Sequence, residues 1–236
     1  MEQSGCGCLY GIGVGPGDPE LMTVKAIRVI RRCGVIFAPG KGETESVAYG
    51  IALKAVPELG EKPRRFVDIP MVHDRAAVEK AYDEAADQVE VFLRQGEDVG
   101  FLNLGDVTLY ATYLHIHRRL LARGCRAELI NGIPSFCAAA AAFHTGLAEG
   151  HEQLHILSKP GQAAEGILLP GTKVVMKSGR GMKDVAEAVK KSGQQVFLAE
   201  NVGMDGERLA CGPEAMTGQE GYYTLLIVKD KKEDED

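Results

Sequence analysis

Short runs of apolar residues alternate along the chain with segments whose apolar residues recur every three or four positions. The short runs are typical of buried strands, and the recurrent spacing is typical of amphipathic helices. The pattern predicts strands at 9–14, 35–38, 99–104, 127–130, 154–157, 174–177, 196–199 and 223–228. It predicts helices at 19–33, 44–55, 74–94, 109–122, 135–143 and 183–191. This alternation favours an α/β fold with largely parallel strands in its first part.

The best boundary within the chain is the segment "ARGCRAE", residues 122–128, where a helix rich in basic residues ends and a new strand begins. No internal repeat or low-complexity linker separates the two halves. We therefore expect two closely packed α/β domains, 1–122 and 123–236.

The segment "GIGVGPGDPE", which begins at Gly11, looks at first like a glycine-rich phosphate-binding turn. Reading G-x-G-x-x-G from Gly11 or Gly13 puts Pro16 or Asp18 where the third glycine belongs. Asp18 and the proline after it instead predict a helix start, with Asp18 as N-cap. Its carboxylate, with Glu20 beside it, occupies the helix end that a phosphate would need. The segment therefore disfavours a nucleotide-binding regulatory module and predicts a tight turn between strand and helix.

The composition is that of a globular protein with a sizeable core, since 45% of 236 residues are hydrophobic. No stretch approaches the roughly 18 consecutive apolar residues of a membrane span, and the N-terminus lacks a secretory signal. We therefore expect a cytoplasmic protein that contacts no membrane. The net charge of −6, without a basic run rich in aromatics, argues against a nucleic-acid partner. The pair Cys6 and Cys8 is interpreted as part of a loose tail rather than as a metal site.

Two further loops repeat the order of strand, turn and helix. In "FLNLGDVTLYATYL" an apolar strand runs into Gly105 and Asp106, and a helix follows. In "INGIPSFCAAAAAF" the helix begins at Ser135. Such loops lie at the carboxyl edge of a parallel sheet, where open α/β sheets bind ligands. Asp106 is thus a candidate site residue, with a plain helix N-cap as the alternative.

The segment "HEQLH", from His151 to His155, formally matches the zinc-hydrolase motif H-E-x-x-H. That chemistry requires both imidazoles on one helical face. Here Pro160 follows closely, and the flanking residues alternate as in a strand, where four residues span roughly 13 Å. His115 and His117, two positions apart on a predicted helix, face different directions. We therefore predict no metal site.

Five segments together resemble the signatures of the tetrapyrrole methylase family, which methylates corrin and sirohaem precursors. They are "GIGVGPGDPELMTVKA", "LGDVTLYAT", "INGIPSFCAAAA", "AENVGMDGER" and "YYTLLIV". The resemblance implies the two-domain α/β fold of that family, the class III methyltransferase fold. It also implies S-adenosyl-L-methionine as cofactor in the interdomain cleft, a tetrapyrrole substrate and a homodimer.

The resemblance also implies roles for individual residues. Asp106 is the tentative catalytic group. The cofactor-binding residues are Pro16, Leu104, Gly105, Asp106, Ser135, Phe136, Met176, Val202 and Thr224. The substrate-binding residues are Gly15, Gly17, Asp18, Lys177 and Arg180. Lys41, Arg64 and Arg65 are further candidate cations for an acidic substrate.

Within the family, "APGKGETESVAYGIA", "GFLNLGDVTLYATYLHI" and "VVMKSGR" resemble the enzymes that methylate C20 of precorrin-2 or cobalt-factor II. The implied function is this step of cobalamin biosynthesis. The alternatives are another tetrapyrrole methylase of the pathway, acting on uroporphyrinogen III or a later precorrin, and more distantly a zinc hydrolase.

Overall fold

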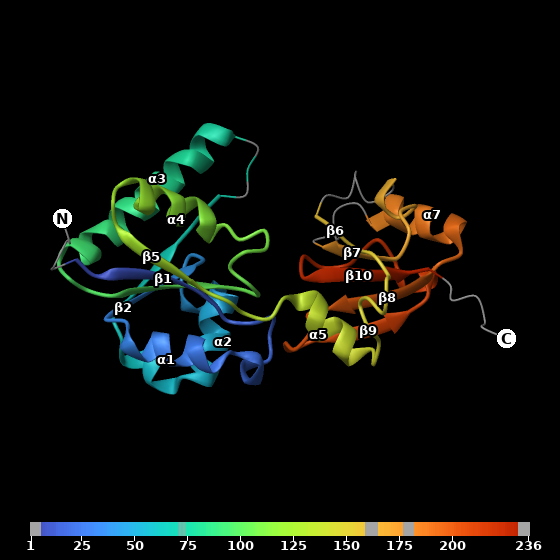
Figure 1. The fold of residues 1–236 in the computed structure, drawn as a ribbon, viewed down its shortest axis with the longest axis horizontal. Coiled ribbons are helices and arrows are strands. Elements are labelled where there is room, and N and C mark those ends of the chain that lie inside the picture. Colours follow the sequence, from blue (N-terminus) through green and yellow to red (C-terminus); the bar gives the residue numbers. More distant parts are fainter. Residues whose placement is uncertain (1–5, 71, 73, 159–164, 177–181, 231–236) are drawn as a thin grey trace. The chain divides into compact units, whose positions relative to one another are not determined.

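The computed structural model describes residues 6–70, 72, 74–158, 165–176 and 182–230. The chain folds as two compact units, Met1–Pro134 and Ser135–Asp236 (Figure 1). The first unit thus extends beyond the expected boundary at 122. The reason is that residues 126–130 form a strand that pairs with the first strand of the chain.

The first unit contains a five-stranded sheet in the order β3-β2-β4-β1-β5. Its strands are β1 (Cys8–Gly13), β2 (Val35–Pro39), β3 (Arg64–Val67), β4 (Val99–Asn103) and β5 (Arg126–Ile130). Every pair in this sheet is parallel, as the sequence predicted. The loops that follow the five strands therefore emerge at one edge. Only β3 was not predicted, because it is a short edge strand that begins with two arginines.

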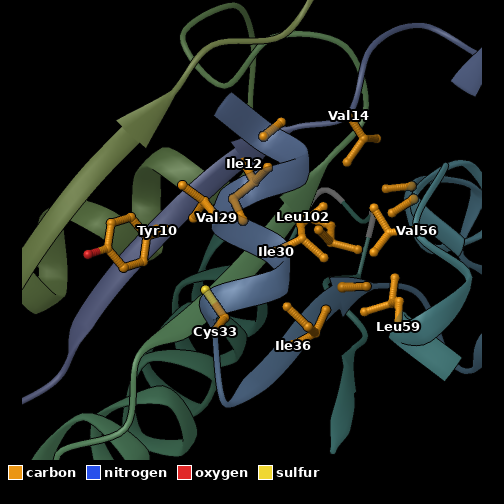
Figure 2. Packing of buried hydrophobic residues seen from close by; sticks show 14 of the residues in the cluster. Tyr10, Ile12, Val14, Val29, Ile30, Cys33, Ile36, Val56, Leu59 and Leu102 are labelled. Atoms are coloured by element: carbon orange, nitrogen blue, oxygen red, sulfur yellow. The ribbon is translucent and has the colours of Figure 1, made fainter. Parts of the chain in front are cut away.

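Helices cover both faces of this sheet (Figure 1). They are α1 (Val24–Arg32) and α2 (Val47–Ala55) on one face, and α3 (Arg75–Arg94) and α4 (Tyr113–Ala122) on the other. Figure 2 shows Ile12, Ile36 and Leu102 of three strands packed with Val29 and Ile30 of α1. Side chains along a strand alternate between the two faces of the sheet. The residues next to Ile12, Ile36 and Leu102 in the sequence therefore face α3 and α4.

The helices predicted at 19–33 and 44–55 are each interrupted. A 3-10 helix, η1 (Pro19–Leu21), precedes α1, and another, η2 (Glu43–Glu45), precedes α2. Both interruptions come from a side-chain hydroxyl that caps the helix that follows. The hydroxyl of Thr23 accepts a hydrogen bond from the amide of Ala26, and the hydroxyl of Ser46 accepts one from the amide of Tyr49. Each hydroxyl starts a new helix. A third 3-10 helix, η3 (Pro57–Glu61), follows α2.

The second unit contains a five-stranded sheet in the order β6-β7-β10-β8-β9. Its strands are β6 (Leu154–Leu157), β7 (Thr172–Met176), β8 (Gln195–Glu200), β9 (Arg208–Cys211) and β10 (Thr224–Lys229). Only β6 and β7 pair in parallel; the other pairs are antiparallel. The short edge strand β9 was not predicted.

The described residues of this unit include the helices α5 (Ser135–Ala142) and α7 (Met182–Ser192), together with the 3-10 helix η4 (Pro213–Ala215). Val185 and Val189 of α7 share a core with Leu198 and Leu226. Phe143, which follows α5, lies on Phe197 with 5.0 Å between ring centroids. Among the described residues, no helix is long and apolar enough to cross a membrane.

Candidate functional site

The loops after β1 and β4 leave the first sheet toward opposite faces. The two strands are parallel neighbours. β1 leads to α1, which packs on one face, whereas β4 leads to α4, which packs on the other. Open α/β sheets bind ligands where neighbouring strands diverge in this way. The candidate site of the first unit therefore lies at the carboxyl ends of β1 and β4.

Glycines bring three loops into backbone contact at this point. The amide of Gly105 donates to the carbonyl of Gly15 at 2.8 Å, and both glycines have positive φ, 72° and 77° respectively. A Cβ on Gly132 would lie 2.2 Å from the carbonyl oxygen of Gly105, and one on Gly13 would lie 2.6 Å from the amide nitrogen of Gly132. Only glycine permits such close approach. The glycine-rich segment is thus explained by backbone packing, without a phosphate.

The loop after β1 carries the predicted residues Gly15, Pro16, Gly17 and Asp18 on consecutive positions. Asp18 is an N-cap, as predicted: its Oδ1 accepts a hydrogen bond of 2.8 Å from the amide of Glu20. The helix that it caps is the 3-10 helix η1.

Asp106, in the loop after β4, is 6% exposed and accepts four hydrogen bonds. Its Oδ1 accepts from the amide of Thr108 at 2.7 Å and from the Thr108 hydroxyl. Its Oδ2 accepts from the side-chain amide of Asn131 at 3.1 Å and from the amide of Gly132 at 2.9 Å. Burial raises the pKa of Asp106, but these hydrogen bonds outweigh burial and hold the pKa below its ordinary value. The carboxylate is therefore ionised at neutral pH.

A groove of about 280 Å³ lies beside the same loop, lined in part by Tyr82, Tyr110, His115 and Arg118. Tyr110 has a positive φ of 49°, which is uncommon for a residue other than glycine. The rings of Tyr82 and His115 stack with 4.5 Å between centroids. His115 and Arg118 stand three residues apart and share one face of α4. This groove was not predicted from the sequence, although the spacing of His115 and Arg118 on a predicted helix is a readable signal.

The other candidate cations of the first unit lie in different places. Lys41 is exposed in the loop that follows β2, at the same edge as the loops after β1 and β4. Arg64 and Arg65 begin β3, so they lie toward the opposite edge of the sheet. Arg64 also forms an ion pair with Glu43. Lys41 is therefore the better placed of the three.

Three predicted residues of the second unit gather at one edge of its sheet. Met176 ends β7 beside β10, where it pairs with Leu225. Thr224 begins β10, and Val202 follows β8 after Asn201, whose amide donates to the carbonyl of Tyr223 at 3.1 Å. Ser135 and Phe136 begin α5. Lys177 and Arg180 lie outside the described residues.

Strand β6 covers Leu154–Leu157 as predicted, so the "HEQLH" segment ends in a strand and is not helical, with His151 in the turn that precedes it. His155 Nε2 lies 3.0 Å from the carbonyl oxygen of Pro170. Glu152 accepts from the Thr172 hydroxyl at 2.9 Å and pairs with Lys229 at 3.3 Å. The segment is thus engaged in contacts within its own unit. Over the described residues, no cluster of three or more histidine, cysteine or acidic side chains is placed to hold a metal.

The prediction of a loose tail around Cys8 was wrong. Cys8 is the first residue of β1 and is buried. Its amide donates to Asp98 Oδ1 at 2.8 Å, which fixes the start of the strand.

Comparison with known proteins gives a family match over most of the chain. The model of the tetrapyrrole (corrin/porphyrin) methylases matches residues 8–216. The chain is 31% identical to a probable cobalt-precorrin-2 C(20)-methyltransferase of Methanocaldococcus jannaschii, over 94% of this chain and 95% of that one. It is 32% identical to a precorrin-2 C(20)-methyltransferase of a Sinorhizobium species, over 97% of each chain.

A solved structure with the same fold is the uroporphyrin-III C-methyltransferase of Thermus thermophilus in complex with S-adenyl homocysteine. It superposes with a TM-score of 0.66 at 19% identity and covers 94% of this chain and 97% of that one. The two-sheet α/β fold expected from the sequence is therefore confirmed. The chain belongs to the tetrapyrrole (corrin/porphyrin) methylase family.

Proposed function

We propose that this protein is an S-adenosyl-L-methionine-dependent methyltransferase that methylates C20 of precorrin-2, or of its cobalt-containing form, in cobalamin biosynthesis. The observation that carries the proposal is the similarity over nearly the whole chain to C(20)-methyltransferases with 31% and 32% identity. The two relatives differ in whether their names include cobalt, so both substrates belong to the proposal.

The proposed cofactor residues fall in two groups, one in each unit. In the first unit they are Pro16, Leu104, Gly105 and Asp106, at the ends of β1 and β4. In the second unit they are Ser135, Phe136, Met176, Val202 and Thr224. The loop at Gly15, Gly17 and Asp18 is proposed to contact the tetrapyrrole. These assignments rest on the family resemblance, on the meeting of the loops after β1 and β4 in the first unit, and on the position of Met176, Val202 and Thr224 at one edge of the second sheet.

The proposed reaction is an in-line displacement at the methyl carbon of a sulfonium. A carbon–carbon bond forms at C20 while the carbon–sulfur bond breaks, and sulfur leaves with the bonding pair as a neutral thioether. C20 is made electron-rich by the ring nitrogens; the positive charge passes from sulfur to the macrocycle and leaves with the C20 proton, which goes to solvent, so the transfer creates no new charge. Alignment and exclusion of water are therefore the main tasks of the protein.

A chain with a net charge of −6 must bind a macrocycle that carries several carboxylates. Because distant charges are screened within roughly 8–10 Å, local cations decide the binding. His115 and Arg118, which line the groove beside the loop after β4, are proposed to hold one carboxylate arm. Lys41, Lys177 and Arg180 are the other proposed partners.

The Arg118→Ala variant tests this part of the proposal. It should raise the KM for the tetrapyrrole at least threefold and leave the affinity for S-adenosylhomocysteine unchanged. Arg28→Ala, an exposed arginine on α1, is the matched control and should change neither. Equal KM values for both variants and the wild type would remove the groove from the substrate site.

Calorimetry with three ligands tests the proposed function against its alternatives. S-adenosylhomocysteine should bind, whereas NAD and zinc should not. Binding of NAD alone would favour a nucleotide-binding module, and binding of one zinc ion per chain would favour a hydrolase. The proposed homodimer is tested separately by light scattering, which should give twice the chain mass of 25.4 kDa.

A further inference from the structure

Asp106 has no acceptor position left for a substrate proton. An ionised carboxylate has about four lone-pair sites, and four donors of the chain occupy them. The side chain is also 6% exposed. A general base needs both a free lone pair and access to the proton that it removes. Asp106 has neither in this arrangement.

The four donors come from two loops that belong to strands separated in the sheet. Thr108 lies in the loop after β4, and Asn131 and Gly132 lie in the loop after β5. In the sheet order β4-β1-β5, the strand β1 stands between them. The carboxylate of Asp106 therefore connects the loop after β4 with the loop after β5 across the end of β1. The two loops can meet there because Gly13 and Gly132 approach each other closely.

We propose that Asp106 is a positioning residue, which ties the loop after β4 to the loop after β5 and thereby sets the backbone of both for the cofactor. This inference rests on the proposed function, which assigns Leu104, Gly105 and Ser135 to the cofactor. Leu104 and Gly105 directly precede Asp106, and Ser135 follows the Gly132 loop by three residues. Loss of the bridge frees both loops at once, so cofactor affinity falls although the carboxylate of Asp106, whose four acceptor positions are filled by the chain, has none left for the cofactor.

The bridge itself is tested by hydrogen exchange without any ligand. In Asp106→Ala both acceptor oxygens are lost, so the amide of Gly132 loses its partner and the amides of residues 131–133 should exchange at least tenfold faster. Asp74→Ala is the matched control, because the Asp74 carboxylate accepts from Ala76 and Ala77 of its own helix. Unchanged exchange at 131–133 in Asp106→Ala would refute the bridge. If that variant does not fold, Asn131→Ala removes one of the two bonds to the loop after β5 and should give a smaller increase in exchange, whose absence would refute the bridge as well.

The link to the cofactor is tested by S-adenosylhomocysteine affinity, measured well below the melting temperature of each variant. Asp106→Asn should weaken binding at least tenfold. Asn131→Ala should weaken it less, and the double variant should bind no more weakly than Asp106→Asn, because both changes remove one connection. Thr108→Val should weaken binding, whereas Thr108→Ser, which keeps the hydroxyl, should restore it.

The outcomes separate this inference from the proposed function. Faster exchange with unchanged cofactor affinity would contradict the positioning role alone. A wild-type protein that does not bind S-adenosylhomocysteine would contradict the proposed function, while hydrogen exchange still tests the bridge. If Asp106→Asn binds the cofactor normally, but kcat falls and the acidic limb of its pH profile disappears, Asp106 is the base and the inference is wrong.

Discussion

A methyl group added at Gly132 should disrupt the candidate site more than its small size suggests. The Cβ of alanine would lie 2.2 Å from the Gly105 carbonyl oxygen and 2.8 Å from the carbonyl carbon of Gly13. Both neighbours are backbone atoms, which cannot rotate away as a side chain does. Overpacking of this kind costs about 1–3 kcal/mol, and each kcal/mol lowers the Tm of a chain of this size by about 2–4 °C.

The same displacement separates the loops after β1, β4 and β5. The affinity of Gly132→Ala for S-adenosylhomocysteine should therefore fall about tenfold, equivalent to about 1.4 kcal/mol. Thermal unfolding by circular dichroism and titration calorimetry measure the two effects on the same sample.

The control is Gly50→Ala in α2, because no atom lies within 4 Å of a Cβ at that position. In a helix this substitution should raise stability by about 0.5–1 kcal/mol. If Gly132→Ala matches the wild type in both Tm and cofactor affinity, the close approach of the three loops is not required and the reasoning fails.

Three other predictions concern groups outside the proposed cofactor site. His117 is buried, with Nδ1 3.0 Å from the Tyr113 hydroxyl, and its pKa lies below 6.5 because of burial and the nearby Arg118. As the pH falls, His117 is therefore protonated in the unfolded state before it is protonated in the folded state, so the free energy of unfolding should fall as the pH drops below 6.5. The His117→Gln variant should show a weaker dependence of this free energy on pH in urea titrations. Asp230→Ala leaves the fully buried Lys173 without its 2.6 Å ion pair and should cost about 3 kcal/mol; a loss below 1 kcal/mol by denaturant titration would contradict this. His155→Ala should keep methyltransferase activity, and dialysis against EDTA should leave the wild type active; a stoichiometric zinc lost together with activity would show that the strand interpretation is wrong.

Most of the strands and helices were predictable because the spacing of apolar residues along the chain follows the positions that are buried. The strands at 9–14 and 99–104 are central, with apolar residues on both sides, and the structure places β1 and β4 within one residue of those bounds. The strands β3 and β9 escaped prediction for the opposite reason. Each is an edge strand of four residues with polar positions, and its identity depends on a neighbour that the local sequence does not reveal.

The candidate site was predictable in its loops but not in its contacts. The order of strand, turn and helix indicated Asp106 and the glycine turn. That Asp106 bonds to Asn131 and Gly132 depends on β5 lying on the far side of β1, which is a property of the sheet order. The same sheet order explains why the first unit continues to Pro134 and does not end at residue 122.

The most direct test of the proposed function is methyl transfer with position-specific detection. The protein is incubated with precorrin-2, or its cobalt-containing form, and S-adenosyl-L-methionine that carries a ¹³C-labelled methyl group. The product is then analysed by mass spectrometry and NMR. We expect one added methyl group, with the label attached to C20. Transfer of the label to a different carbon would indicate another methylase of the pathway, and the absence of transfer from both substrates would contradict the proposed function.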